Sequence, residues 1–430
     1  MLAAGAGIER AELALRAGLA QLGCALLEPL LAADAGYRGP HAKCRAGHQA
    51  GFAGYRDKTI GTVPGPISLR RAWYHCAACG HGLAPRDAEL GVAGQTMSPG
   101  LRKMTARAAA AVPFAAAAKL IGELAGITLT GKRAGRRAEA DGQAAAQVIK
   151  AQAAAITARQ VVPLPPAGPA PDMLYIAIDG TGVPMIPAET EGRPGKADDG
   201  KAHTREVKLC CVFTQTSLDE QGRPVRDPAS SSYLATFAPA AEFGILMAGE
   251  ARRRGAAHIR QLTVLGDGAA WIWNLAAQHF PEATQTVDLY HAREHLHELA
   301  KLLEFMLGDH RSDWLQARLA ELDNGDIDAI SAAARAFPLS GRKAAELGTA
   351  LGYFEHNAHR MRYAHFKSLG MFIGSGAVEA GCKAVVGQRL KLSGMRWTKA
   401  GATGILTLRC LEASDRWEEI LTQPSKTPAA

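Results

Sequence analysis

The pattern of apolar and polar residues divides the chain into segments with different periodicities. In residues 1–35 large apolar residues recur at helical spacing. This predicts a helix over residues 7–34 with one buried face, made of Ile8, Leu13, Leu15, Leu19, Leu22 and Leu26. Residues 36–97 contain short strand-like runs between glycines and prolines, such as residues 67–74, and this predicts a small β module. Residues 98–160 are rich in alanine and favour helices.

The remaining chain has an α/β pattern. Five prolines within residues 161–171 predict a semi-rigid linker over residues 161–172. In residues 173–425, apolar runs of strand length predict five strands, at 174–178, 206–213, 232–237, 262–265 and 284–288. A mainly helical stretch follows, with a helical insertion expected at about 297–370. Five strands with helices between them favour a mixed sheet covered on both faces.

Three acidic residues stand beside glycines at the ends of predicted elements. Asp179 and Asp267 each end a predicted strand and precede a glycine, and Glu379 lies just inside a predicted helix after Gly374-Ser-Gly376. Acids at strand ends can meet at one edge of a sheet. Three converging carboxylates can hold a pair of hard cations for phosphodiester chemistry. The alternative is that each Asp-Gly pair is an ordinary turn.

Longer sequence motifs occur near these acids and in the amino-terminal half of the chain. They are Tyr55-Arg-Asp-Lys58, Arg71-Ala-Trp-Tyr-His-Cys76, Asp267-Gly-Ala-Ala-Trp-Ile-Trp-Asn274, Asp288-Leu-Tyr-His291-Ala-Arg-Glu-His295, Gly374-Ser-Gly-Ala-Val-Glu379 and Arg389-Leu-Lys-Leu-Ser-Gly-Met-Arg-Trp-Thr398. Over nearly its whole length the chain resembles the bacterial insertion-sequence DDE transposases of the ISKra type.

This resemblance implies an α/β ribonuclease H-like catalytic core with an all-helical insertion. Asp179, Asp267 and Glu379 would be the catalytic acids and would hold two Mg²⁺ or Mn²⁺ ions. Asp288 and His291 look like the D-x-x-H motif of Mutator-type transposases. The resemblance further implies cleavage of element ends, joining of the 3′-hydroxyl to target DNA, and a homodimer or larger synaptic complex. The alternatives are a non-mobile or domesticated nuclease with the same core, or a zinc-containing DNA-binding regulator.

Several residues near these motifs have two interpretations. His291 is either a structural hydrogen-bonding residue or a group that orients the scissile phosphate or protonates a leaving group. The tryptophans Trp271, Trp273 and Trp397 are either core aromatics or base-stacking residues. The basic residues after Glu379 either bind DNA phosphates or form a solvated face; these are Lys383, Arg389, Lys391, Arg396 and Lys399.

The amino-terminal half contains two further candidate sites. Cys76-Ala-Ala-Cys79-Gly80 is typical of a metal-binding turn. Zinc needs four ligands, and Cys44 with His48, or with His41 instead, would complete a structural site. A redox pair and a merely packed pair are the alternatives.

A possible helix-turn-helix lies in the alanine-rich region. A helix over residues 113–124, a turn at 125–127 and a second helix capped by Thr128 or Thr130 predict this motif. Lys132, Arg133, Arg136 and Arg137 share one face of the second helix, which would enter the major groove. A solvated basic helix is the alternative.

The overall charge agrees with a nucleic-acid partner. Lys+Arg exceed Asp+Glu by 49 − 41 = 8, which favours a polyanion such as double-stranded DNA. Eight cysteines in 430 residues are too few for a disulfide scaffold. We find neither a secretory signal pattern nor 18 consecutive uncharged apolar residues, so we expect a cytoplasmic, nucleoid-associated protein without a membrane span.

Overall fold

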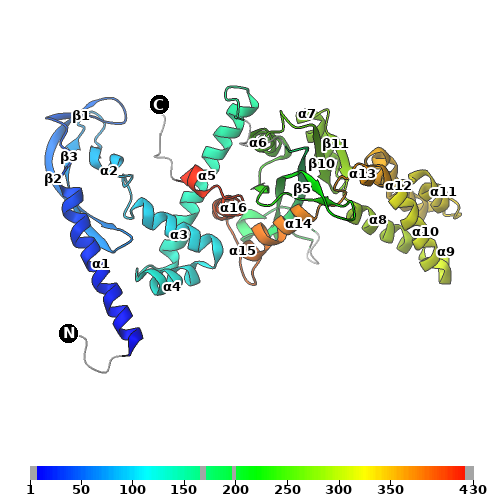
Figure 1. The fold of residues 1–430 in the computed structure, drawn as a ribbon, viewed down its shortest axis with the longest axis horizontal. Helices are drawn as coiled ribbons and strands as arrows, with labels where there is room; N and C mark the ends of the chain where they lie inside the picture. Colours follow the sequence, from blue (N-terminus) through cyan, green and yellow to red (C-terminus); the bar gives the residue numbers. More distant parts are fainter. Residues whose placement is uncertain (1–6, 165–170, 196–199, 422–430) are drawn as a thin grey trace. The chain divides into compact units, whose positions relative to one another are not determined.

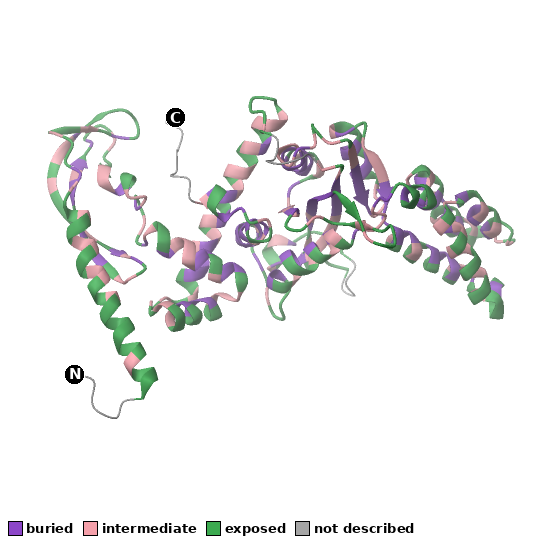
Figure 2. Ribbon diagram, viewed as in Figure 1, coloured by how far each residue is buried: buried purple, intermediate pink, exposed green. Residues whose placement is uncertain are grey.

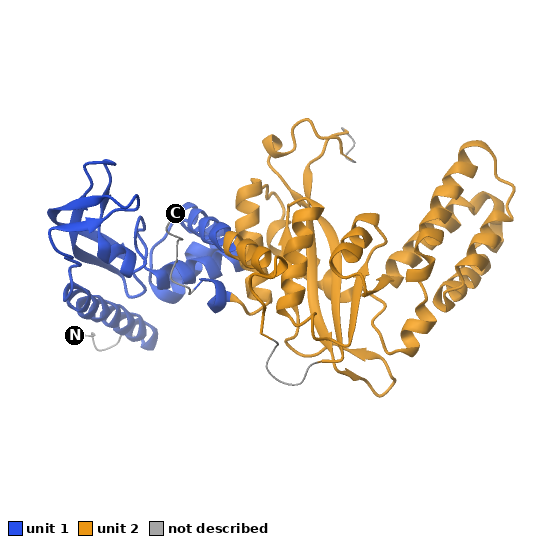
Figure 3. Cartoon of the chain, turned by 90° about the horizontal axis from the view of Figure 1, so that it is seen from above, with its two compact units in different colours: residues 1–145, 417–430 blue, residues 146–416 orange. Residues whose placement is uncertain are grey.

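The computed structural model describes residues 7–164, 171–195 and 200–421, in two compact units (Figures 1 and 3). Unit 1 comprises residues 1–145 and 417–430, and unit 2 comprises residues 146–416. The division falls inside helix α5 (Gly131–Thr157), ahead of the predicted linker at 161–172. Residues 165–170 of that linker and residues 422–425 of the predicted catalytic domain lie outside the described residues.

Unit 1 begins with a long helix and a four-stranded antiparallel sheet. The sheet has the order β1-β2-β3-β4, with bounds His41–Lys43, Gln49–Gly61, Pro66–His75 and Gly82–Leu83. Helix α2 (Pro85–Glu89) follows and contains the buried Asp87. Asp87 accepts hydrogen bonds from Arg71 at 2.7 Å and from Lys58 at 2.9 Å. The motifs Tyr55–Lys58 and Arg71–Cys76 therefore have a structural role, because Lys58 on β2 and Arg71 on β3 hold α2 against the sheet.

Helix α1 (Ile8–Ala32) confirms the predicted helix but not its predicted buried face. The six residues assigned to that face are 49–78% exposed (Figure 2). The sheet covers a different stripe, in which Cys24, Leu27 and Leu31 pack against the cluster of Ile60, Ile67, Leu69 and Val92. Spacing predicted the helix, but the short sheet covers only one narrow side of it.

Helix α1 also meets the length and composition expected of a membrane span. The sequence analysis expected no span because the chain has no run of 18 uncharged apolar residues. Helix α1 contains charged residues, but its mean hydropathy is still high enough for a span. A single such helix near the amino terminus is weak evidence, because signal sequences and core helices of other proteins meet the same criteria.

Unit 1 continues with α3 (Pro99–Ala111), α4 (Phe114–Ala125) and the start of α5. Gly126 ends α4 in the left-handed conformation that glycine favours. Thr130 caps α5 by accepting a hydrogen bond from the Arg133 N–H at 3.2 Å, so Thr130, not Thr128, is the cap. A Cβ at Gly135 would lie 2.8 Å from the Phe114 ring. Glycine there lets α4 pack against the first turns of α5.

Unit 2 is built on a mixed five-stranded sheet. The order is β11-β10-β5-β6-β9, with bounds, in chain order from β5, of Met173–Pro184, Thr204–Gln215, Ser232–Thr236, Gln261–Gly266 and Thr284–Val287. β5, β6 and β9 form an antiparallel meander, and β10 and β11 add in parallel beside β5. All five predicted strands exist, and the prediction of a mixed α/β structure is confirmed.

Alternation along β5 separates two faces of this sheet. Leu174, Ile176 and Ile178 join the main core with residues of α6 (Ala240–Arg253) and α7 (Ala270–His279). The residues between them point to the opposite face, since side chains alternate along a strand. Asp179 belongs to that second face.

Helices α8 to α13 follow β11, and four further helical segments complete unit 2. The first group comprises Leu289–Leu302, Glu304–Leu307, Arg311–Asn324, Ile327–Arg335, Gly341–Asn357 and Tyr363–Ser368. The second comprises α14 (Gly376–Gly381), the π-helix η4 (Cys382–Gly387), α15 (Gln388–Leu390) and α16 (Lys399–Ala413). The last helix, α17 (Trp417–Leu421), belongs to unit 1. Minor elements are β7 (Ser217–Leu218), β8 (Pro224–Val225) and the 3-10 turns Pro187–Glu189, Gly308–His310 and Ala358–Arg360.

Candidate functional site

Asp179 lies on β5, and Asp267 directly follows the end of the neighbouring parallel strand β10. β10 pairs with β5 up to Leu265, which lies opposite Ala177. Asp179 lies two residues further along β5, and Asp267 lies two residues after Leu265, just beyond the end of β10. Asp179 was expected at the end of its strand, but β5 continues to Pro184 in its pairing with β6. It is the parallel partner β10 that ends here, which leaves this edge open beside Asp179.

Glu379 is linked to Asp288, after the end of β11, by a chain of hydrogen bonds. The Leu289 N–H donates to the Ile373 carbonyl at 3.0 Å, and the Ser375 N–H donates to Oδ2 of Asp288. The Ser375 hydroxyl donates to Oε1 of Glu379 at 3.3 Å. The glycine-rich turn before α14 is thereby attached to the end of β11, one strand away from Asp267.

Cys382 ties the other end of α14 to Asp179. Its thiol donates to Oδ2 of Asp179 at 3.2 Å. Burial raises the pKa of this thiol, and the negative charge of Asp179 raises it further, so Cys382 is a hydrogen-bond donor. The segment 375–382 therefore connects Asp288, which follows β11, to Asp179, which lies within β5. Sequence reasoning missed Cys382, although its position three residues after Glu379 on a helix could have suggested it.

Asp288 and His291 form a helix cap. Oδ1 of Asp288 accepts the His291 N–H at 2.9 Å, and Oδ2 is taken by Ser375. Asp288 is fully buried and anchors α8 to the turn before α14. This structural role differs from the catalytic role that the sequence predicted for it. The His291 ring is half-buried and lies 3.3 Å from a carboxylate oxygen of Glu294.

Tyr353, outside the sequence motifs, and His295, the last residue of the motif that begins at Asp288, support Asp267 from the helical stretch. The hydroxyl of Tyr353, on α12, donates to the Asp267 carbonyl at 3.0 Å, and His295 stacks on the Tyr353 ring with centroids 3.6 Å apart. Gly268 has φ +98°, and a Cβ there would lie 2.6 Å from the Tyr353 ring. The glycine after Asp267 is thus required both by backbone conformation and by the approach of α12.

The basic residues after Glu379 divide into exposed and buried ones. Lys383, Arg396 and Lys399 are exposed, and Lys391, also exposed, donates to the Thr181 hydroxyl on β5. Arg389 and Trp397 were expected to contact DNA, but they are 0% and 6% exposed. The guanidinium of Arg389 lies 5.1 Å from the centre of the Trp397 ring, whose N–H donates to the Leu390 carbonyl. Both residues pack inside the domain and present no surface to a base or phosphate.

The other tryptophans also have packing roles. Trp273 is buried beneath the guanidinium of Arg360, 4.7 Å from its ring centre. Trp271 is half-buried and packs edge-on against Phe243, with ring centroids 5.9 Å apart. The interpretation as core aromatics fits these contacts.

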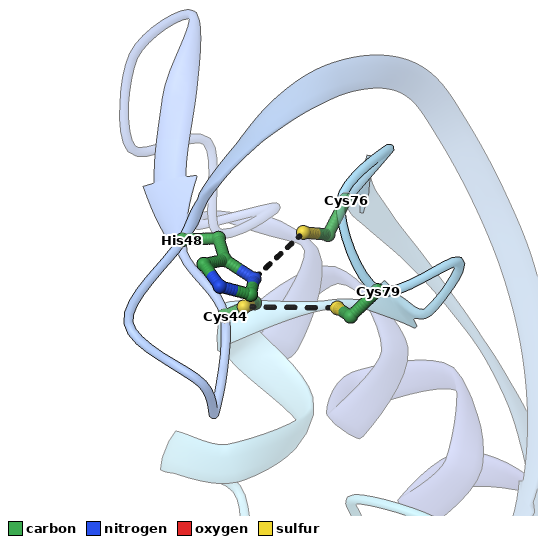
Figure 4. A group of neighbouring side chains, drawn as sticks. All are labelled: Cys44, His48, Cys76 and Cys79. Atoms are coloured by element: carbon green, nitrogen blue, oxygen red, sulfur yellow. Dashed lines mark hydrogen bonds between the residues drawn. The ribbon is translucent and has the colours of Figure 1, made fainter.

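Three cysteines and a histidine of unit 1 converge (Figure 4). The ligand atoms of Cys44, His48, Cys76 and Cys79 all lie within 4.8 Å of one another. Two turns place them: Gly47 N–H donates to the Cys44 carbonyl at 2.9 Å, and Gly80 N–H donates to the Cys76 carbonyl at 2.8 Å. His48 completes the group, and His41, the alternative ligand on β1, is not part of it.

The spacing of this group fits tetrahedral zinc. Zn–S bonds of 2.3 Å place two sulfurs about 3.8 Å apart, and the Cys44 and Cys79 sulfurs are 3.9 Å apart. Nδ1 of His48 lies 3.8 Å from the Cys76 sulfur. The hydrogen bond from Cys79 lowers the pKa of Cys76 to about 6 against the opposing effect of burial. The group could hold zinc, which binds thiolates.

The predicted basic face of α5 lines a pocket of about 440 Å³. Lys132, Arg133, Arg136 and Arg137 form one wall, and residues 94–97 with Thr130 form the other. Arg137 makes an ion pair with Asp141 and donates to Gln95, and Arg133 donates to Thr96 at 3.1 Å. Ala134 and Ala138 are buried on the opposite face of the helix. The cationic side is therefore turned towards solvent, where an anion can enter.

No protein-family model matches the chain, and no curated protein matches it significantly. Within residues 7–164, 171–195 and 200–421, only the Cys44 group brings three or more Cys, His, Asp or Glu ligand atoms within 4.8 Å of one another.

Proposed function

We propose that this chain is a DNA transposase with a ribonuclease H-like catalytic domain. The strand arrangement supports the fold: an antiparallel meander of β5, β6 and β9, then two parallel strands joined through α6 and α7. The sequence resemblance to DDE transposases implies the same architecture. Helices α9 to α13, between β11 and α14, would be the helical insertion.

The observation that carries the proposal is the arrangement of the acids. Asp179, on β5, and Asp267, just after β10, each come two residues after the last pair of these adjacent parallel strands. The segment bearing Glu379 is tied to Asp288 on one side and to Asp179 on the other. Carboxylate oxygens are the donors that Mg²⁺ and Mn²⁺ prefer, so this set fits these ions in chemical type. When bound, a pair of such ions activates the attacking oxygen and stabilises the leaving oxygen of a phosphodiester.

The remaining residues of the domain would bind and orient DNA. Lys391 lies beside Thr181, two residues after Asp179, and can neutralise a phosphate there. His291, on the first turn of α8, would orient or protonate the substrate. The zinc-type group and the cationic pocket of unit 1 support the binding of double-stranded DNA through its backbone. We further propose that the protein acts in the cytoplasm at the nucleoid.

The first experiment measures DNA cleavage. Supercoiled plasmid and end-labelled duplexes made from DNA flanking the gene are incubated with the full chain in Mg²⁺ or Mn²⁺. We expect nicking, and we expect Asp267→Asn, Asp179→Asn and Glu379→Gln each to reduce it at least 100-fold, about 2.7 kcal/mol of barrier. Asp309→Asn, an exposed acid on the 3-10 turn Gly308–His310, is the matched control and should cleave normally. Activity within about tenfold of the parent for Asp267→Asn would exclude the two-metal assignment.

The second experiment separates a transposase from a nuclease. A pre-cleaved duplex with a free 3′-hydroxyl is mixed with unlabelled plasmid, and joined products are measured. We expect joining that depends on Asp267. Cleavage without joining on any flanking sequence would favour the non-mobile nuclease instead.

A further inference from the structure

An exposed apolar ladder runs along helix α1. Its members are large apolar residues that the sheet leaves uncovered, namely Ile8, Leu15, Leu19, Leu22, Leu26 and Leu30, each 54–78% exposed. Six such residues on one helix are unusual for a surface in contact with water, and a contiguous apolar patch marks an interaction site. We therefore expect another apolar surface to cover the ladder.

The spacing of the ladder is that of a two-stranded coiled coil. Leu15, Leu19, Leu22 and Leu26 are separated by four, three and four residues, which alternates the two core positions of a heptad. Ile8 lies one heptad before Leu15. The same register places Glu12 and Pro29 at core positions and Leu30 at the edge of the seam. Gly18 and Ala25 line one edge of the ladder, and a Cβ at Gly18 would meet nothing within 4 Å. Small residues at this edge allow a second helix to come close.

The other side of α1 is already in use. Cys24, Leu27 and Leu31 pack on the sheet, and Oε1 of Glu28 accepts the Ser68 N–H at 2.6 Å. Insertion into a membrane would break these contacts and would bury the charges of Glu12, Arg16 and Glu28 in lipid. A partner that covers only the ladder preserves the contacts with the sheet and leaves Arg16 and Glu28 outside the seam, which favours a helix over a bilayer.

We infer that the α1 ladder binds the same ladder of a second copy of this chain, as a two-stranded helical interface. From Ile8 to Leu30 the seam is about 33 Å long at 1.5 Å per residue. Six large apolar side chains of roughly 100 Å² each, mostly exposed and flanked by small residues, give about 1,000 Å² over both copies. This is the lower limit of a specific interface, so we expect a reversible dimer with a dissociation constant in the micromolar range. The inference does not rest on the proposed function, because it concerns unit 1 without DNA.

The test is sedimentation equilibrium of the full chain over about 1–100 μM, a range that brackets a micromolar constant. Nuclease treatment and about 0.5 M salt exclude bridging by DNA. The variant Leu19→Gln/Leu22→Gln should associate at least tenfold more weakly than the parent. Leu13→Gln is the matched control, because Leu13 is an exposed leucine of the same helix that lies off the ladder. It should dimerise like the parent.

A second double variant and a vesicle-flotation assay complete the test. Leu15→Gln/Leu26→Gln serves as a second variant if the first loses helix by circular dichroism, and it should be monomeric too. Dimers that persist in both folded double variants would place the interface elsewhere and overturn the inference. A monomeric parent at 100 μM would overturn it as well. Flotation of the parent, but not of the double variants, with phosphatidylcholine–phosphatidylglycerol vesicles would assign the ladder to a membrane instead.

Discussion

The thiol of Cys382 donates a hydrogen bond to Oδ2 of Asp179 at 3.2 Å, although 203 residues separate the two in the chain. This contact joins the helix of Glu379 to the strand of Asp179. It also fixes one carboxylate oxygen of an acid that we expect to bind metal. Cys382 is thus a positioning residue within the proposed site.

We predict that Cys382→Ala weakens Mg²⁺ binding by about two- to tenfold, because a typical hydrogen bond contributes roughly 0.5–1.5 kcal/mol. Cys382→Ser retains a donor and should restore most of the affinity. Calorimetric titration of each variant with Mg²⁺ measures the effect, with cleavage rates at saturating metal as a second readout. Identical affinities for the parent and the alanine variant would mean that the contact is incidental to metal binding.

Removal of the Tyr353 hydroxyl should impair cleavage without unfolding the protein. Tyr353→Phe loses the hydrogen bond to the Asp267 carbonyl but keeps the ring against Gly268 and His295. We expect a several-fold lower rate at saturating Mg²⁺ and a melting temperature near that of the parent.

Gly268→Ala should be more severe than Tyr353→Phe, because it adds both backbone strain and a clash with the ring. Gly348→Ala on α12, where an added Cβ meets nothing within 4 Å, is the control. A Gly268→Ala variant with full activity would show that the Asp267 turn tolerates displacement.

Zinc should stabilise the sheet of unit 1. Cys79→Ser removes one ligand and should lower bound zinc well below one per chain, with residues 36–97 losing protection from hydrogen exchange first, since metal binding is coupled to folding. Cys24→Ser, a cysteine outside the metal-type group, should retain full occupancy. Protein purified under reducing conditions and found free of zinc by elemental analysis would refute the site.

The cationic pocket should contribute phosphate contacts to DNA binding. Lys132→Ala and Arg136→Ala should each weaken binding and reduce the salt dependence of affinity by about one unit. Arg137→Ala should also destabilise the helix, because Arg137 is paired with Asp141. Lys119→Ala, on the exposed side of α4, is the control. Fluorescence anisotropy at several salt concentrations measures these slopes, and unchanged slopes would make this helix a scaffold.

A buried ion cluster should set the acid stability of unit 2. Burial alone would raise the pKa of Glu250, but Arg253 at 2.6 Å and Arg416 at 2.9 Å outweigh it and lower this pKa to about 2, from 4.5. A pKa lowered on folding stabilises the protein above the unfolded value, so this contribution is complete above about pH 4.5 and is lost as the pH falls towards 2.

Glu250→Gln should therefore cost about 3–5 kcal/mol at neutral pH by leaving two arginines without their carboxylate. It should also flatten the pH dependence of unfolding below pH 4.5. Glu242→Gln, which breaks only the exposed pair with Lys150, should cost under about 1 kcal/mol. Equal losses in the two variants, measured by urea unfolding, would contradict the role of this cluster.

The sequence by itself determined the elements and the local groups. Apolar runs of strand length predicted all five strands of the unit 2 sheet, and Thr130 with Gly126 marked the turn before α5. Two short turns predicted the Cys44, His48, Cys76 and Cys79 group. These features depend on residues a few positions apart, so they can be predicted from periodicity, capping residues and the spacing of side chains.

Tertiary structure decided which surfaces those elements bury and which distant residues meet. It left the ladder of α1 exposed, because the sheet is too narrow to cover both sides of the helix, and it buried Arg389 and Trp397 in spite of their polar and stacking chemistry. It also brought Cys382 to Asp179 and Tyr353 to Asp267. Such contacts depend on the order and register of strands and on how helices pack over them, and no local pattern specifies these because they arise from burial of the whole core.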